Sequence, residues 1–162
     1  MLIDDLQRKA AEAFVAGTRK ASPALRSRAM SGPGRRLITA QIFAGMARSF
    51  DRRKGADLDA VIRWDIGSPG SPPEESWDLV IRDGSAHAIR NGGAEGAEPR
   101  TTVGLDRETL LELATGILNA PQAYLAGRLR MQGDVMLAQR LTTLFTVPGA
   151  AKPKPVAAAP PA

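Results

Sequence analysis

A pair of alternating segments joined by Asp83-Gly84 constrains the fold more than any other feature of this sequence. In residues 77–82, large apolar side chains alternate with Asp, Val and Arg, which is the two-residue period of a strand with one buried face. Asp-Gly between such segments favours a two-residue hairpin turn. With that turn, Ile81 pairs with Ala86, Leu79 with Ala88 and Trp77 with Arg90. Large side chains thus meet alanines, which fits a sheet face against which a helix or a ligand lies closely.

Further strands and helices are predicted on both sides of this hairpin. Alternation predicts strands at 60–67, 100–105 and 128–132. Helical spacing of apolar residues predicts an amphipathic helix over 3–18 and a second apolar stripe over 37–50. Later helices are expected to begin at the capping residues Asp106, Asn119 and Asp134, the second of them ending at Gly127. The 162 residues then divide into an N-terminal helix and basic arm (1–36), one domain (37–146) and a disordered tail rich in Pro and Ala (147–162).

Few side chains suited to catalysis or metal binding are available. The chain has no cysteine, which excludes disulfides, thiolate metal sites and cysteine nucleophiles, and it has a single histidine, His87. Glu74, Glu75 and Asp78 lie where a loop enters a strand without an evident partner, so we interpret them as solvated carboxylates. We therefore expect no catalytic residue, no metal site and no cofactor. An enzyme would need a nucleophile or base that this sequence does not offer.

Positive charge is concentrated before the predicted domain body. Residues 1–58 contain twelve Lys and Arg against five Asp and Glu. Such clusters attract the phosphates of lipid headgroups, coenzyme A or nucleic acid, although an arginine-rich solvated surface explains them equally well. Trp64 and Trp77 are predicted to face the core, and no aromatic pair stands beside the basic residues to stack on bases. We therefore expect no nucleic-acid partner.

The sequence offers no pattern for insertion into or export across a membrane. No apolar run approaches the roughly 18 residues that a spanning helix requires. The N-terminus begins with Asp4 and Asp5 rather than with a basic leader followed by an apolar stretch. A cytoplasmic location is the resulting expectation.

The segment 100–145 is rich in apolar residues, and their periodicity does not distinguish a filled core from a cavity. Its residues 121–134, PQAYLAGRLRMQGD, together with the hairpin strand 77–84, the strand 101–105 and the helix 110–116, resemble the sterol carrier protein 2 domain. The resemblance covers roughly residues 38–146. It implies an α/β (α+β) fold: a five-stranded, mostly antiparallel sheet with helices packed on one side, enclosing an apolar tunnel.

The resemblance also implies a function and a site. Members of this family bind or transfer lipids and have no catalytic apparatus of their own, so the ligand would be a fatty acid, an acyl-CoA, an isoprenoid or a sterol-like molecule. Transient partners would be an anionic membrane surface or an enzyme of a lipid pathway. Carried over by position, the tunnel would be lined by Leu110, Leu113, Ile117, Tyr124, Leu129, Met131, Met136, Leu137 and Leu144.

Two departures from the family pattern leave alternatives open. The extension through Gly34 and the Pro/Ala tail lie outside it, and the peroxisomal targeting end of the family is absent, which points to a bacterial-type cytoplasmic member. The alternatives are an accessory or scaffold protein of lipid or isoprenoid-quinone biosynthesis, and a protein-interaction module whose core is filled.

Overall fold

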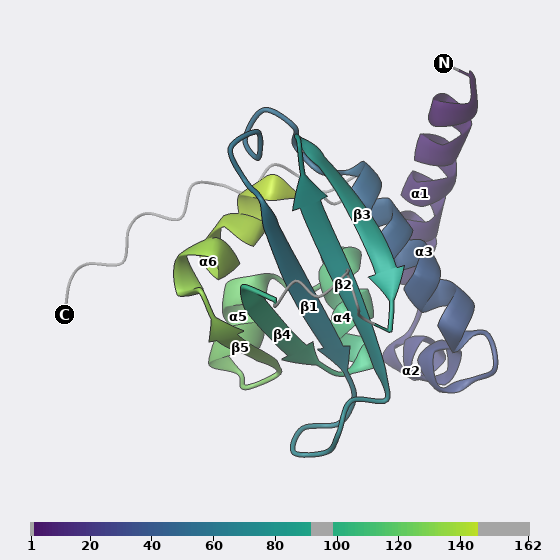
Figure 1. Cartoon of the computed structure of the whole chain (residues 1–162). Helices are drawn as coiled ribbons and strands as arrows, with labels where there is room; N and C mark the ends of the chain where they lie inside the picture. Colours follow the sequence, from purple (N-terminus) through teal and green to yellow (C-terminus); the bar gives the residue numbers. More distant parts are fainter. Residues whose placement is uncertain (1, 92–98, 146–162) are drawn as a thin grey trace, which may run out of the picture.

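A single mixed sheet organises the molecule (Figure 1). The computed structural model describes residues 2–91 and 99–145, so the predicted tail at 147–162 and most of the predicted loop at 91–99 lie outside it. The strands are β1 (Ala60–Ile66), β2 (Glu75–Arg82), β3 (Ser85–Arg90), β4 (Thr101–Leu105) and β5 (Leu129–Gly133). They lie in the order β3-β2-β1-β4-β5. Of the four neighbouring pairs, β1 and β4 are parallel and the others are antiparallel. The predicted five-stranded, mostly antiparallel sheet is confirmed.

The hairpin that opened the sequence argument forms in the predicted register. Ile81 pairs with Ala86, Leu79 with Ala88 and Trp77 with Arg90. Asp83 and Gly84 have φ angles of 51° and 71°. Positive φ at both central residues is what a type I′ turn requires, and its twist matches that of the flanking strands. The turn therefore fixes which side chains of β2 and β3 face the helices.

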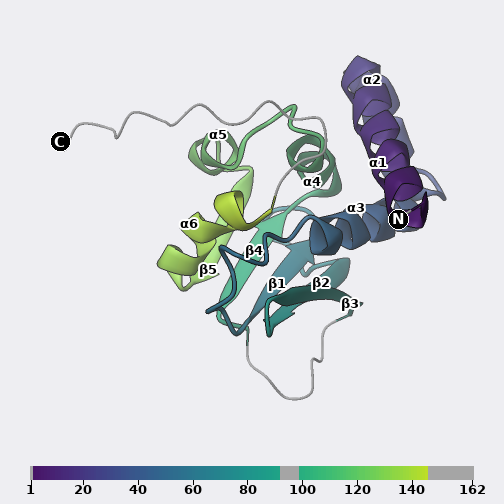
Figure 2. The ribbon, with the colours of Figure 1, turned by 90° about the horizontal axis from the view of Figure 1, so that it is seen from above.

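The helices gather on one side of the sheet, as predicted (Figure 2). α3 (Arg35–Arg48) contacts β2 and β3, whereas α5 (Ala120–Leu125) and α6 (Val135–Leu144) lie over the β4–β5 half. α4 (Arg107–Ala114) packs against α3. Farther out lie α1 (Leu2–Lys20) and α2 (Pro23–Ser31). The basic part of the predicted N-terminal region (1–36) thus contains a second helix, of nine residues.

Side-chain caps determine where three of the helices begin. The carboxylates of Asp106 and Asp134 accept hydrogen bonds from the backbone N–H groups of Thr109 and Leu137, and the Asn119 side chain accepts one from Gln122. Each bond satisfies an N–H group that the first helical turn leaves without a partner. The predicted starts of α4, α5 and α6 are confirmed.

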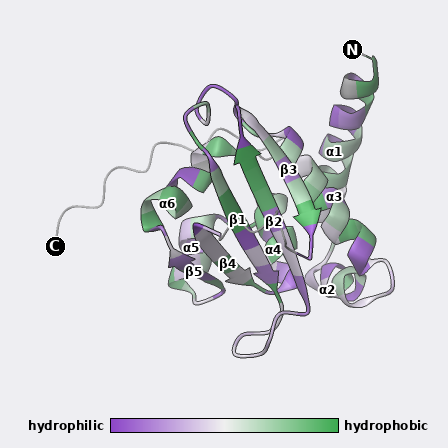
Figure 3. Ribbon diagram, in the orientation of Figure 1, coloured by the Kyte–Doolittle hydropathy of each residue, from purple (hydrophilic) through white to green (hydrophobic). Residues whose placement is uncertain are grey.

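The core lies between the sheet and the near helices. Phe43 of α3 is fully buried and contacts Trp64 edge-on and Trp77 in a stacked arrangement, with ring centroids 5.9 and 4.9 Å apart. Both tryptophans are buried, as predicted. Figure 3 shows hydrophobic residues in the central strands and also at the outer end of α1, which stands away from the sheet. Within residues 2–91 and 99–145, no helix is both long and apolar enough to cross a bilayer.

Candidate functional site

A pocket of about 670 Å³ lies between α3 and the β2–β3 hairpin. One wall is formed by Ala40, Ala44 and Ala47 of α3, and the other by Ala86 and Ala88 of β3. The lining is mostly apolar, and the pocket opens to solvent. Its volume falls in the range of about 300–1,000 Å³ that is usual for small-molecule sites.

Small side chains at regular spacing create this space. The three alanines of α3 are separated by four and three residues, which places them on one face of the helix. Ala86 and Ala88 are two residues apart on β3 and therefore point to the same side of the sheet. Because a methyl group extends so little from either backbone, helix and strand leave a gap that larger residues would fill.

Aromatic rings also line the pocket. Trp77 lines it and stacks on Phe43, with an angle of 13° between the rings. Phe50, also in the lining, contacts Phe145, with ring centroids 5.6 Å apart. Such packed rings offer rigid apolar surface to a ligand.

The other lining residues give the pocket a positively charged end. Arg48 is exposed at the last turn of α3, and Arg52 donates from Nε to the carbonyl oxygen of Gly84 at 3.0 Å. The lining that the structure describes contains no Asp or Glu. An apolar ligand with an anionic end therefore matches both the surface and the charge of this pocket.

The nine residues predicted to line a tunnel differ in how deeply they are buried. Four are buried in the core, namely Leu110, Leu129, Leu137 and Leu144. Leu113 and Met131 are partly buried against that core. Ile117, Tyr124 and Met136 are exposed, with 37%, 53% and 71% of their surfaces accessible.

None of these nine residues lines the pocket beside α3. Sequence reasoning pointed to large apolar residues of α4–α6 and β5 and did not single out the alanines of α3. The sequence did contain one relevant signal. Large residues of β2 pair with Ala86 and Ala88 of β3, which indicates a sheet face that a helix or a ligand can approach closely. Alanines at helical spacing in residues 40–47 complete that signal.

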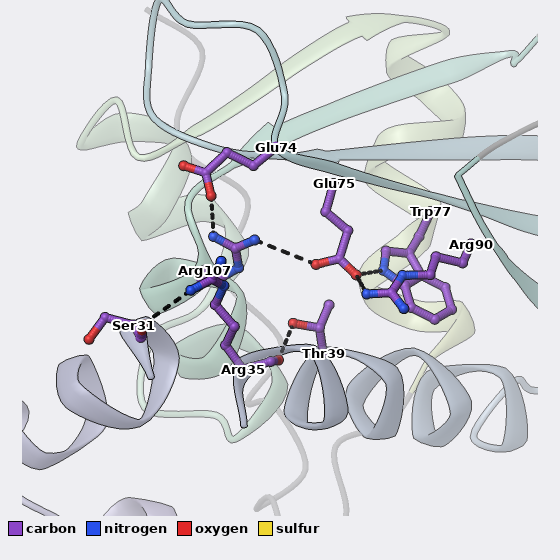
Figure 4. A network of polar contacts seen from close by, with 8 residues as sticks. All are labelled: Ser31, Arg35, Thr39, Glu74, Glu75, Trp77, Arg90 and Arg107. Carbon is purple, nitrogen blue, oxygen red and sulfur yellow. Dashed lines mark hydrogen bonds and ion pairs between the residues drawn. The ribbon is translucent and has the colours of Figure 1, made fainter. Parts of the chain in front are cut away.

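The interpretation of the acidic residues as solvated is wrong for Glu75 and Asp78. They are only 5% and 0% exposed, and arginines on neighbouring strands pair with them. Arg63 donates to both carboxylate oxygens of Asp78 at 2.9 and 3.0 Å. Glu75 Oε1 accepts hydrogen bonds from Trp77 Nε1 and Arg90, each at 2.9 Å (Figure 4). Pairing of this kind is what makes a buried carboxylate tolerable.

Glu74 is half-exposed and pairs with Arg107, and the hydrogen bond from that guanidinium lowers the pKa of the Glu74 carboxyl. His87 lies opposite Val80, as predicted, and is exposed on β3. Across the described ranges, no three His, Cys, Asp or Glu side chains are grouped to hold a metal ion. The pocket between α3 and the β2–β3 hairpin thus has a mostly apolar wall and a positively charged end.

Comparisons with known proteins agree with the fold. The model of the SCP-2 sterol transfer family matches residues 44–146, more than half of the chain. "Peroxisomal multifunctional enzyme type 2" of Mus musculus is 30% identical over 115 residues, which are 69% of this chain and 15% of that protein. The chain thus corresponds to a small part of that relative.

Solved structures share the same architecture. Sterol Carrier Protein 2 Like 2 from Aedes aegypti aligns with a TM-score of 0.52 and 20% identity, over 69% of this chain and all of that one. The sec-alkylsulfatase Pisa1 from Pseudomonas sp. aligns with a TM-score of 0.57 and 23% identity, over 75% of this chain and 18% of that one. Together with the matched residues 44–146, these findings show that the chain belongs to the SCP-2 sterol transfer family.

Proposed function

We propose that this protein is a non-enzymatic lipid carrier and that its ligand occupies the pocket between α3 and the β2–β3 hairpin. The observation that carries the proposal is a mostly apolar pocket of about 670 Å³ in a member of a sterol transfer family. Transfer of a lipid chain from water into such a pocket is favourable by about 0.8 kcal/mol for each buried methylene. A carrier requires from its binding site only apolar contact with the ligand and an opening to solvent, and this pocket has both.

The charge at the pocket end favours a ligand with an anionic head. Arg48 and Arg52 would lie beside the head, and the chain would lie along the alanines toward Trp77. A fatty acid or an acyl-CoA has such a head, as does a phosphorylated isoprenoid, whereas a sterol does not. Fatty acids and acyl-CoA esters are therefore the ligands to test first.

Filling the pocket with a side chain tests its role. We expect Ala44→Trp to weaken binding of a fluorescent fatty acid by ~10-fold or more, because the indole occupies space that the lipid chain needs, and a factor of ten is only about 1.4 kcal/mol. Gln41→Trp adds the same ring at an exposed position of the same helix and serves as the control. Equal binding by both variants would exclude the pocket as the lipid site.

The region between α4–α6 and the sheet is a second location for the ligand, favoured by the family resemblance. Leu137→Trp separates the two locations, since Leu137 is 2% exposed in the core. If that region opens to hold lipid, the variant stays folded and loses binding. If it is a filled core, overpacking lowers the free energy of unfolding by about 1–3 kcal/mol and the α3 pocket still binds lipid.

A role as an accessory or scaffold protein is the other candidate, and α1 favours it. Leu2, Ile3 and Leu6 are at least 70% exposed on a helix that stands away from the body. Apolar residues in such a position fit a contact with another macromolecule. Replacing Ile3 and Leu6 with Ser should leave lipid binding unchanged, whereas a scaffold would lose its partner in a pull-down from cell extract.

A further inference from the structure

A cluster of charged residues near the starts of α3 and α4 has more positive than negative charge. Arg35 begins α3 and Arg107 begins α4, and their side chains reach toward each other (Figure 4). Glu74, Glu75 and Arg90 complete the cluster. Three guanidinium groups thus share two carboxylates, which leaves a net charge of one positive unit.

Arg107 and Arg90 pair directly with the two carboxylates, whereas Arg35 acts on Glu74 through its charge. Arg107 pairs with Glu74 through Nη1 and lies 3.7 Å from Glu75 through Nη2. Arg90 pairs with Glu75 at 2.9 Å. For Arg35, the hydrogen bond from its guanidinium goes from Nη1 to the backbone oxygen of Ser31 at 3.2 Å. The excess positive charge therefore lies at Arg35.

Both facing arginines also have a donor that is out of contact with water. The Nε atoms of Arg35 and Arg107 are buried and have no hydrogen-bond partner among the described residues. A buried donor without a partner is costly, and its presence calls for a group that would satisfy it. Guanidinium groups donate in a planar fork that matches the oxygens of a phosphate.

We propose that Arg35 and Arg107 form a binding site for a phosphate group. The phosphate would take the place of the Glu74 carboxylate beside Arg107, accept hydrogen bonds from both guanidinium groups and balance the excess charge of the cluster. The site is separate from the lining of the α3 pocket and does not depend on the proposed lipid function. Its ligand is a phosphate ester or diphosphate, either of a small soluble molecule or of a lipid headgroup.

Glu74 is the group that the phosphate would displace. Its side chain is 51% exposed and can turn into solvent, where water replaces the hydrogen bond from Arg107. Glu75 would stay in place, because Trp77 and Arg90 hold it. Arg107 therefore keeps one carboxylate and exchanges the other for phosphate.

Titration with pyrophosphate, followed through the side-chain Nε–H signals of arginine in NMR spectra, tests the site. We expect saturable shifts of the Arg35 and Arg107 signals, and sodium chloride at equal ionic strength should not reproduce them. Arg35→Gln should weaken binding by ~10-fold or more, which is the usual range for hydrogen bonds to charged groups. Glu74→Gln should strengthen it, since the competing carboxylate is gone.

Arg36→Gln is the matched control, because Arg36 is the next residue of α3, is exposed and carries the same charge. Equal losses in Arg35→Gln and Arg36→Gln would reduce the effect to general surface charge and overturn the proposal, as would the absence of saturation. Vesicles of phosphatidylcholine with and without phosphatidic acid separate the two ligand sources. Vesicle binding that depends on Arg35 assigns the site to a headgroup, and pyrophosphate binding without it assigns a soluble ligand.

Discussion

Glu75 and Asp78, which the sequence places where a loop enters a strand, are buried in the protein interior. Asp78 is fully buried on the face of the sheet opposite α3, and Arg63 on β1 binds both of its oxygens. The register of β1 and β2 places Arg63 directly across from Asp78 and so allows this pair to form. Whether a carboxylate can be buried therefore depends on the residue that the neighbouring strand places beside it.

The pair makes a direct prediction for stability. Arg63→Gln should lower the free energy of unfolding by about 3 kcal/mol, because it removes the main charge partner of a buried carboxylate. Urea unfolding measures the loss. Adding Asp78→Asn should restore much of it, and a double variant as unstable as the sum of the two single variants would show that the pair is not coupled.

A second residue-scale prediction concerns Asp134, the cap of α6. The backbone N–H of Leu137 and then the Arg100 side chain bind its carboxylate, and both lower the pKa of Asp134 below the ordinary 3.8. A lowered folded pKa adds stability that is present above the unfolded pKa and is lost as the pH falls through the folded one. Asp134→Asn keeps a capping side chain, so it should lose less stability than the wild type in urea unfolding as the pH falls below about 4, close to the ordinary value. An equal loss in both proteins would contradict the shift.

At the scale of elements, glycines fix the connections on either side of β5. Gly127, after α5, has a φ of 72°, and an added Cβ there would contact nothing within 4 Å. Gly133, at the end of β5, has a φ of 96°, and an added Cβ would lie 2.4 Å from the backbone oxygen of Arg100. The first position requires only the left-handed conformation, whereas the second also requires that no side chain be present.

The two glycines should therefore respond differently to the same substitution. Gly127→Ala should lower the free energy of unfolding by about 1 kcal/mol, the cost of a left-handed alanine. Gly133→Ala should cost about 3 kcal/mol or more, because backbone must also move. Thermal or urea unfolding of both variants measures the difference, and similar losses would show that β5 can shift away from Arg100.

The elements were also the part of the structure that the sequence predicts best. Asp83-Gly84 determined the hairpin register, and Asp106, Asn119 and Asp134 marked three helix starts, because each signal acts between residues close in sequence. No local signal predicts the parallel pairing of β1 with β4, because its partners are far apart in the chain.

The site was harder to predict than the elements for a physical reason. Periodicity identifies the inward face of a helix, but a cavity is defined by what the opposite wall leaves empty. Leu110 and Leu137 have the same apolar pattern as a tunnel wall and are packed in the core. The alanines of α3 give a weaker hydrophobic periodicity than these leucines, and they line the pocket.

At the scale of the whole molecule, the two halves of the sheet should respond differently to a ligand. The pocket lies against β2 and β3, whereas α5 and α6 lie over β4 and β5. A long-chain fatty acid should therefore slow hydrogen exchange in residues 38–52 and 77–90 more than in 107–144, as followed by mass spectrometry. Stronger protection of 107–144 would move the lipid to the region between α4–α6 and the sheet.

All residues that line the pocket lie between positions 40 and 88 of the chain. During synthesis they leave the ribosome before β4, β5 and the helices that cover them. The antiparallel pairs β1–β2 and β2–β3 join neighbouring segments, so they close short loops and form quickly. The nascent chain therefore has both walls of its pocket in reach of each other before the second half of the protein exists.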